Sequence, residues 1–249
     1  MITKDEYIFG IRAVIEAIES GKDIDKVLIK KDLKSELAAE LFAKMKEYSI
    51  VGQRVPVDRI NRITKKNHQG VVAILSAITF ASLDNVVPEL YEKGETPLVV
   101  ILDGITDVRN FGAIARTCEC AGVNAIVISE RNSAGVNGDA VKTSAGALLH
   151  IPVCREKSAL NAVKYLKDSG FQIVGATEKG AVNYTKIDYT VPTAIVMGAE
   201  DVGISVDILK ICDSYAAIPQ FGHISSLNVS VAAGILIYEA VRQRIANNN

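Results

Sequence analysis

The sequence has little cysteine, and this excludes a disulfide-rich scaffold. Its 249 residues include only four cysteines, Cys118, Cys120, Cys154 and Cys212, whereas small secreted domains without a large core depend on many more. The Cys118 and Cys120 pair has neither the spacing of a zinc finger nor a histidine nearby. We therefore expect all four cysteines to be small core residues.

Long apolar runs are also missing. The most hydrophobic stretches, "TPLVVILDGI" and "VSVAAGILIYEAV", are too short or too often interrupted by polar residues to span a bilayer. The N-terminal "MITKDEYIFGI" lacks a signal-peptide pattern. We expect a cytoplasmic protein that makes no membrane contact. Because 49% of the residues are hydrophobic, the chain can build one large domain or two modest ones.

No charge of one sign dominates, since the formal net charge is −1. The segment 54–67, "RVPVDRINRITKKN", is locally basic, and five cations there face the single acid Asp58: Arg54, Arg59, Arg62, Lys65 and Lys66. A strip of this kind is either a phosphate-contacting surface or an ordinary solvated face. The adjoining Asn67, His68 and Gln69 either hydrogen-bond bases and ribose hydroxyls or form a turn into the next strand.

The pattern of hydrophobic residues changes along the chain. Residues 1–79 read as a small α/β unit, and the acidic segment 80–97 with two prolines reads as a linker or short helix. From Leu98 to the end, apolar strands alternate with amphipathic helices. Such alternation predicts an α/β domain over 98–249, with a parallel sheet covered by helices on both faces.

Several common catalytic motifs are absent. The sequence contains no G-x-G-x-x-G dinucleotide fingerprint, no G-x-x-x-x-G-K-[ST] phosphate loop and no G-x-S-x-G hydrolase motif. Its three histidines, His68, His150 and His223, lie far apart in the sequence without metal-ligand spacing, so we expect no metal.

Polar side chains gather instead in three segments that each follow a predicted strand. These segments are 103–122, 196–205 and 218–230, and loops after parallel strands meet at one edge of the sheet, where ligands bind. Asn110 in the first segment is a candidate N-cap, and Arg116 lies on the helix that follows. Each feature alone also fits an ordinary turn, a helix cap or a surface cation.

The three segments resemble a known family. "NFGAIARTCECAG", "IVMGAEDVGIS" and "IPQFGHISSLNVSVAAGILIYEA" are similar, in this order, to the signature motifs of the SpoU (TrmH-type) RNA 2′-O-ribose methyltransferases of the SPOUT superfamily. Upstream, "IFGIRAVIEAI" and "KKNHQGVVAIL" resemble the RNA-binding domain of the subgroup that methylates a guanosine ribose in 23S ribosomal RNA. The resemblance covers nearly the whole chain.

This resemblance implies an RNA-binding domain over 1–79 and a catalytic domain over 98–249 with a deep trefoil knot. It also implies S-adenosyl-L-methionine as cofactor, large-subunit rRNA as partner and a homodimer formed through the C-terminal domain. Two rival functions stay open. The substrate can be a transfer RNA, or the chain can be a non-catalytic RNA-binding or ribosome-assembly protein.

The resemblance also assigns roles to individual residues. The catalytic set implied by the motifs is Arg116, Asn110, Glu200, Ser226 and Asn228, and the cofactor-binding set is Gly198, Ile218 and Leu227. A ribose hydroxyl is a poor nucleophile at neutral pH, and an arginine is an unusual base because its pKa exceeds about 12. Arg116 either takes the proton with help from a substrate phosphate, or holds that phosphate and stabilises the developing oxyanion.

Overall fold

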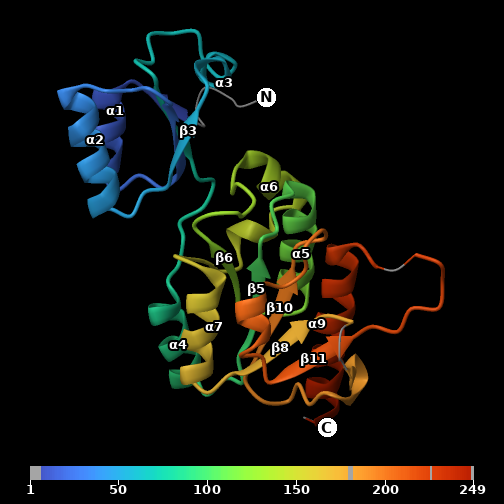
Figure 1. Ribbon diagram of the computed structural model, residues 1–249. Coiled ribbons are helices and arrows are strands. Elements are labelled where there is room, and N and C mark those ends of the chain that lie inside the picture. Colours follow the sequence, from blue (N-terminus) through green and yellow to red (C-terminus); the bar gives the residue numbers. More distant parts are fainter. Residues whose placement is uncertain (1–6, 179–181, 225, 248–249) are drawn as a thin grey trace. The chain divides into compact units, whose positions relative to one another are not determined.

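The structure is a computed structural model that describes residues 7–178, 182–224 and 226–247. It divides into two compact units (Figure 1). Unit 1 consists of Met1–Thr79 with Gly135–Gly138, and unit 2 consists of Phe80–Ala134 with Asp139–Asn249. Each unit is built from its own sheet and helices.

Unit 1 is a four-stranded sheet with helices on both faces. In spatial order its strands are β1 (Tyr7–Phe9), β4 (Val71–Leu75), β2 (Ile24–Lys30) and β3 (Gly52–Val55). Strand β4 runs antiparallel to β1 and β2, whereas β3 is parallel to β2. Its helices are α1 (Ile11–Glu19), α2 (Glu36–Glu47) and α3 (Val57–Asn61).

Unit 2 contains a seven-stranded sheet in which every neighbouring pair is parallel. In spatial order the strands are β7 (Val153–Glu156), β6 (Ala125–Ser129), β5 (Leu98–Asp103), β10 (Thr193–Gly198), β8 (Gln172–Ala176), β11 (Ser214–Ala217) and β9 (Val182–Asn183). The predicted α/β class with a parallel sheet is confirmed, and the trefoil knot stays a prediction.

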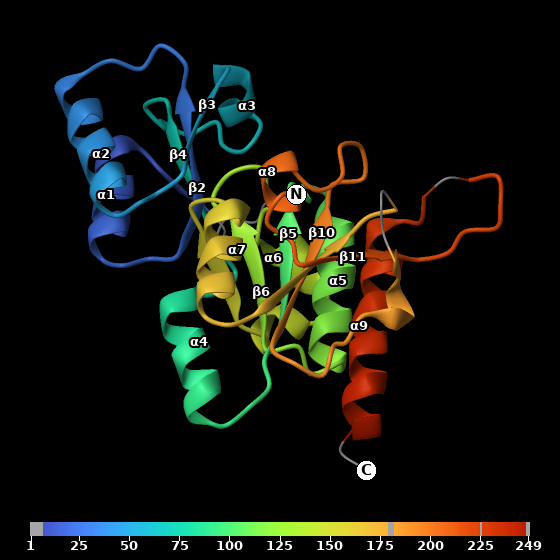
Figure 2. The ribbon, with the colours of Figure 1, turned by 60° about the horizontal axis from the view of Figure 1, so that its bottom comes forward.

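Helices cover both faces of this sheet. They are α4 (Leu83–Glu92), α5 (Val108–Cys120), α6 (Gly138–Thr143), α7 (Ala159–Asp168), α8 (Val206–Leu209) and α9 (Val229–Asn247), with short 3₁₀ helices at Ala147–Leu149 and Tyr184–Lys186. Figures 1 and 2 show α4 and α7 on one side of the sheet and α5 and α9 on the other. Helix α9 packs against α5. None of the described helices is long and apolar enough to cross a membrane.

The segment 80–97 belongs to the core of unit 2. Helix α4 within it buries Leu83, Val87 and Leu90, and the first two pack in the same cluster as strand residues Val99 and Ile101. Ser82 caps the helix by accepting a hydrogen bond from the backbone N–H of Asp84. The part of the chain expected to be a linker or short helix is therefore a helix that covers the sheet.

The cysteines differ in burial. Cys118 and Cys154 are buried and Cys212 is half-buried, but Cys120 is exposed, so the expectation of a core position is wrong for Cys120. Cys118 and Cys120 lie two residues apart on α5, which turns their side chains to different sides of the helix. Burial raises the pKa of the Cys154 thiol to about 12, so this group is neutral at physiological pH.

Candidate active site

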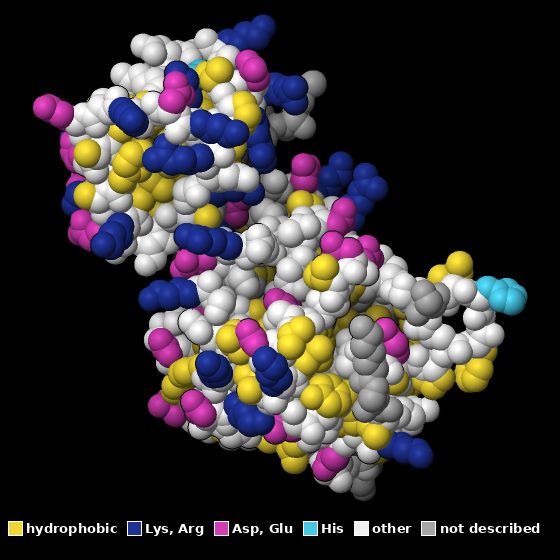
Figure 3. All heavy atoms as spheres, in the orientation of Figure 1, with side chains coloured by type: hydrophobic (Ala, Val, Ile, Leu, Met, Phe, Trp, Pro, Cys, Tyr) yellow, Lys and Arg dark blue, Asp and Glu magenta, His cyan; other side chains and the backbone are white. Residues whose placement is uncertain are grey.

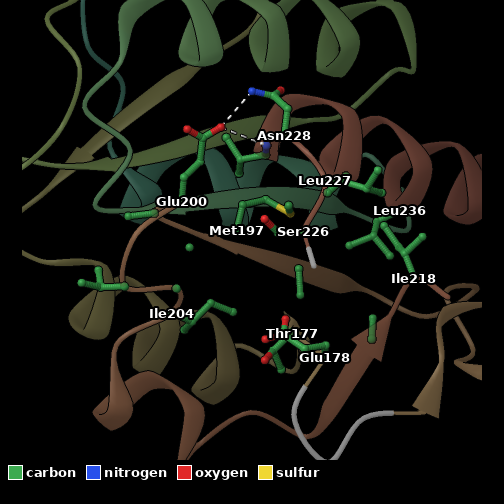
Figure 4. A pocket seen from close by; sticks show the side chains of 18 of the residues that line it. Thr177, Glu178, Met197, Glu200, Ile204, Ile218, Ser226, Leu227, Asn228 and Leu236 are labelled. Atoms are coloured by element: carbon green, nitrogen blue, oxygen red, sulfur yellow. Dashed lines mark hydrogen bonds between the residues drawn. The ribbon is translucent and has the colours of Figure 1, made fainter. Parts of the chain in front are cut away.

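The carboxyl ends of β5, β8, β10 and β11 meet at one edge of the unit 2 sheet. Strands β10 and β5 are in register through the pair Gly198 and Asp103 at their last residues. A cavity of about 600 Å³ opens at this edge, lined by residues that follow β8, β10 and β11 (Figure 4). A smaller cavity of about 220 Å³ adjoins the loop after β5. Both cavities are lined in part by Glu200 and Val229.

The loop after β10 folds back over Gly198. The backbone N–H of Ser205 donates to Oδ2 of Asp103 at 2.7 Å, and the N–H of Gly203 donates to the carbonyl of Ala199 at 2.8 Å. A Cβ at position 198 would lie 2.2 Å from the carbonyl carbon of Gly203 and from the nitrogen of Ile204. Only glycine fits there, because the opposing atoms are backbone and cannot rotate away.

Glu200 is the centre of a polar cluster at the same edge. Its Oε1 accepts hydrogen bonds from Nδ2 of Asn228 at 2.8 Å, from Nδ2 of Asn110 at 3.1 Å and from the backbone N–H of Val229 at 3.4 Å. Nδ2 of Asn228 also donates to Oδ1 of Asn110 at 2.9 Å. The cluster therefore joins side chains from all three predicted segments.

Two members of this cluster, Asn110 and Asn228, lie at the starts of helices α5 and α9. Oδ1 of Asn228 accepts the backbone N–H of Ser230 in the first turn of α9. Asp107, and not Asn110, is the N-cap of α5, because its Oδ1 accepts the N–H groups of Arg109 and Asn110. The predicted N-cap is wrong by three residues, since Asp and Asn are equally good caps in a sequence. With the cap supplied by Asp107, the Asn110 side chain reaches Glu200 instead.

The large cavity has polar residues at both ends and apolar residues between them. Figure 4 shows Glu200 and Asn228 at one end and Thr177 and Glu178 at the other. Ser226 and the three predicted cofactor residues, Gly198, Ile218 and Leu227, are all lining residues. The neighbouring Ser225 lies outside the described residues.

Several lining residues were not predicted from the sequence. Thr177 and Glu178 follow β8, and Met197, Ile204 and Leu236 supply further apolar surface. The sequence does show Thr177 and Glu178 as a polar pair after a predicted strand. The pair could not be assigned to the site without knowing that β8 lies between β10 and β11 in the sheet.

Arg116 lies apart from both cavities. It is exposed on α5, six residues after Asn110 and therefore about 9 Å further along the helix axis. It is not among the lining residues of either cavity. Among the described contacts, no hydrogen bond or salt bridge joins Arg116 to the Glu200 cluster.

The charges around the large cavity are acidic. Its described lining residues include the carboxylates of Glu178, Glu200 and Asp201 and no lysine or arginine, an arrangement that favours a cationic ligand. Among the described residues, no three His, Cys, Asp or Glu side chains are grouped as metal ligands would be.

In unit 1, two side chains of the "NHQG" turn have partners within the fold. Nδ1 of His68 accepts the backbone N–H of Gly70 at 2.9 Å, and its Nε2 lies 2.9 Å from Oδ1 of Asn61. Oε1 of Gln69 accepts the N–H of Ile11 at the start of α1 at 3.1 Å. These contacts support the interpretation of the segment as a structural turn.

Two family models match this chain and together cover most of its length. Residues 97–238 match the model of the SpoU rRNA methylase family, and residues 7–81 match the substrate-binding model of the RNA 2′-O ribose methyltransferases. The chain belongs to the SpoU family. This SpoU-family protein is also 36% identical over 241 residues to a protein of Staphylococcus aureus whose name assigns it to the TrmH family of tRNA/rRNA methyltransferases. The alignment covers 97% of each chain.

Solved structures of other family members resemble the SpoU-family fold described above. The AdoMet-bound rRNA methyltransferase of Sinorhizobium meliloti has a TM-score of 0.62 at 28% identity, covering 95% of this chain and 87% of its own. AviRb of Streptomyces viridochromogenes in complex with AdoMet has a TM-score of 0.60 at 28% identity, covering 96% and 90%. The TrmH/SpoU tRNA-modifying enzyme of A. aeolicus is 35% identical with a TM-score of 0.56, covering 67% and 86%.

Proposed function

We propose that this SpoU-family RNA methyltransferase transfers a methyl group from S-adenosylmethionine to the ribose 2′-hydroxyl of a guanosine in 23S ribosomal RNA. The S-adenosylmethionine-dependent 2′-O-methylation of RNA follows from membership of the SpoU family. The choice of ribosomal RNA is supported by the share of this chain that aligns with each solved structure. The rRNA methyltransferase of S. meliloti aligns with 95% of this chain, whereas the tRNA-modifying enzyme of A. aeolicus aligns with 67%.

The large cavity suits S-adenosylmethionine in size, charge and shape. Its volume of about 600 Å³ lies within the usual range for small-molecule sites. Ile218, Leu227 and Leu236 offer apolar surface for an adenine ring. Gly198 lets the loop through Gly203 and Ile204 close against the end of β10, and this loop forms part of the cavity wall. When bound, the cofactor supplies an electrophilic methyl group on a positively charged sulfonium, which the neighbouring carboxylates favour.

The Glu200 cluster holds the reacting groups in position. Oε1 of Glu200 already accepts three N–H donors, so we assign this carboxylate to positioning and not to proton removal. It fixes Asn110 and Asn228, whose amides lie between the large cavity and the smaller one next to Asp107. Ser226, Asn110 and Asn228 then orient the ribose so that its 2′-oxygen lies in line with the methyl carbon.

Arg116 is the cation that this mechanism still requires. Its guanidinium would hold the phosphate beside the target ribose and stabilise the negative charge that develops on the 2′-oxygen. Because Arg116 lies outside the cavities of its own chain, we place it at the cavity of a second copy. The proposed homodimer brings the two together.

Exposed apolar residues around α9 support such a dimer. Val231, Tyr238 and Ile245 on this helix are each at least half exposed, and α9 packs against the helix that carries Arg116. Phe221 and Ile224, in the loop before α9, are more exposed still. Val231, Tyr238 and Ile245 are spaced seven residues apart and so form a stripe along α9. An exposed apolar stripe of this kind is typical of a protein interface.

The deciding experiment maps ribose methylation across total cellular RNA with and without the gene. We expect one guanosine of 23S RNA to lose its 2′-O-methyl group, and the purified enzyme to restore it on RNA from the deletion strain. Loss of a methyl group from a transfer RNA would favour the tRNA alternative. No change in any RNA, together with no methyl transfer in vitro, would favour a non-catalytic RNA-binding role.

A further inference from the structure

The two faces of the unit 1 sheet are covered by different helices. Side chains alternate along a strand, so Val27 and Ile29 of β2 pack with α1 and α2, whereas Leu28 between them packs on the opposite face with Ile60 of α3. Strand β4 alternates in the same way. An RNA bound flat against unit 1 therefore meets either the α1/α2 face or the α3 face.

The α1/α2 face is acidic, and two of the three cations on its helices are paired with glutamates. Together α1 and α2 carry three basic and five acidic residues, namely Arg12, Lys44 and Lys46 against Glu16, Glu19, Glu36, Glu40 and Glu47. Arg12 pairs with Glu40 at 3.0 Å, and Lys44 pairs with Glu19 at 3.0 Å. This face would repel a polyanion.

Arg54 belongs to this same side of the sheet. Its guanidinium lies over the Phe42 ring of α2 and donates to the carbonyl of Lys31 at 2.8 Å. The basic strip of the sequence is therefore divided between the two faces. Its first member serves to attach β3 to α2, while the others lie on or after α3.

The segment 58–66, which contains most of α3 and the residues after it, carries four cations against one acid. Arg59, Arg62, Lys65 and Lys66 are exposed, and none of them forms a salt bridge among the described residues. Asp58 is the single acid of the segment. Figure 3 shows Lys and Arg side chains spread over the visible side of this unit, including the region of α3 and β3.

Two aromatic rings lie on the same face. Tyr7 and Phe9 are two residues apart on the edge strand β1, half-buried against the α3-side cluster, and their ring centroids are 6.2 Å apart. The ammonium of Lys66 lies 5.5 Å from the centroid of the Phe9 ring. Unpaired cations beside aromatic rings are the combination that binds single-stranded nucleic acid, because phosphates meet the cations and unstacked bases meet the rings.

We infer that the α3 face of unit 1, formed by Tyr7, Phe9, Arg59, Arg62, Lys65 and Lys66, binds a single-stranded segment of the substrate RNA. This inference rests on the proposed function and adds to it the face, the contact residues and the form of RNA that is recognised. His68 and Gln69 are left out of this surface, because both ring nitrogens of His68 and the Oε1 of Gln69 have partners within the fold.

The test compares matched variants on the two faces of the full-length protein. Lys65→Gln/Lys66→Gln removes two charges from the α3 face, and Arg12→Gln/Lys44→Gln removes two from the α1/α2 face. With a single-stranded RNA of about 12 nucleotides, we expect the first pair to weaken binding about tenfold or more and to reduce the log–log salt slope by about 1.4. The control pair should change the Kd by less than about threefold.

A second comparison tests the aromatic contribution. Tyr7→Leu keeps an apolar side chain on β1 but removes the stacking ring, and Tyr48→Leu does the same at an exposed tyrosine after α2. We expect Tyr7→Leu to weaken single-strand binding at least about fivefold and to leave binding of a duplex of the same sequence unchanged. Tyr48→Leu should affect neither RNA.

The inference is overturned if the Lys65/Lys66 pair leaves affinity and slope unchanged, or if the two pairs have equal effects. It is also overturned if Tyr7→Leu weakens duplex and single strand alike. Methyl transfer by the wild-type protein, measured at saturating 23S RNA, separates these results from the proposed function. If the wild-type protein methylates RNA but the α3-face variants bind RNA normally, the proposed function stands and the proposed RNA-binding surface is wrong. If the variants bind RNA weakly but the wild-type protein does not methylate RNA, the surface stands and the proposed function is wrong.

Discussion

Glu200 and Asn228 are 28 residues apart in the chain and are joined by a 2.8 Å hydrogen bond from the Asn228 amide to the Glu200 carboxylate. Asn110, a further 90 residues upstream of Glu200, donates to the same oxygen. This contact arises because β5 and β10 are neighbours in register, so the loops that follow them begin side by side. The start of α9 brings Asn228 to the same edge.

The first prediction removes the acceptor at the centre of this cluster. Glu200→Ala leaves three N–H donors without their partner, and hydrogen bonds to a charged group contribute roughly 1.5–3 kcal/mol each. We expect kcat/KM for methyl transfer to fall about 100-fold, which is roughly 2.7 kcal/mol. Asp207→Ala is the control, since Asp207 lines neither cavity and its exposed carboxylate pairs with Lys210. Equal activity of the two variants would contradict the role given to Glu200.

The second prediction concerns the close approach at Gly198. In Gly198→Ala the new methyl group would meet backbone atoms of Gly203 and Ile204 at 2.2 Å, so the loop over the cavity must move. We expect the Kd for S-adenosylmethionine, measured by calorimetry, to rise about tenfold or more, and stability to fall by about 1–3 kcal/mol. Gly222→Ala provides the comparison, because a Cβ there meets nothing within 4 Å. A Gly198→Ala protein that binds the cofactor normally would show that the loop is free to adjust.

Most strands and helices of unit 2 could be predicted from the sequence, but the order of the strands in the sheet could not. Near-continuous apolar strands such as Leu98–Asp103 indicate a parallel sheet because both faces are buried. The insertion of β10 between β5 and β8 could not be predicted, since strand order depends on contacts between segments far apart in the chain. Thr177 and Glu178 were missed for this reason, although they follow a correctly predicted strand.

Short-range assignments failed where two residues compete for one role. Asp107 and Asn110 are both good N-caps, and the outcome decides whether the Asn110 side chain is available to Glu200. The segment 80–97 was ambiguous in a similar way. Its acidic residues and prolines suggest a linker, but Leu83, Val87 and Leu90 at helical spacing give α4 a buried face.

The third prediction follows from this burial. A fragment that begins at residue 98 lacks α4, and burying a large apolar side chain contributes about 1.5–3 kcal/mol. Loss of Leu83, Val87 and Leu90 would therefore remove about 5–9 kcal/mol, comparable to the whole stability of an ordinary domain. We expect the fragment 80–249 to melt cooperatively and to bind S-adenosylmethionine, and the fragment 98–249 to do neither. A cooperative transition of the shorter fragment in circular dichroism would show that α4 is dispensable.

The last prediction tests Arg116 and the dimer together. Arg116→Ala should lower methyl transfer more than about 100-fold while leaving the cofactor Kd nearly unchanged, because the role proposed for this guanidinium is to hold the RNA phosphate and not the cofactor. Its exposure on α5 means that the melting temperature should also be unchanged, as it should be for the control Glu119→Ala on the same helix. Activity within about tenfold of wild type, or roughly 1.4 kcal/mol, would exclude a catalytic role.

Mixing two inactive variants then locates the arginine. If Arg116 acts at the cavity of the second copy, a dimer of one Arg116→Ala chain and one Glu200→Ala chain contains one complete site, formed by the intact Arg116 and the intact Glu200 of different chains. Random exchange of subunits makes about half of the dimers mixed, so equal amounts should recover about a quarter of wild-type activity. If Arg116 serves its own chain, every site in the mixture lacks one group and activity stays at background. Light scattering at the assay concentration must show a dimer for the first result, because a monomer has no second copy to supply the guanidinium.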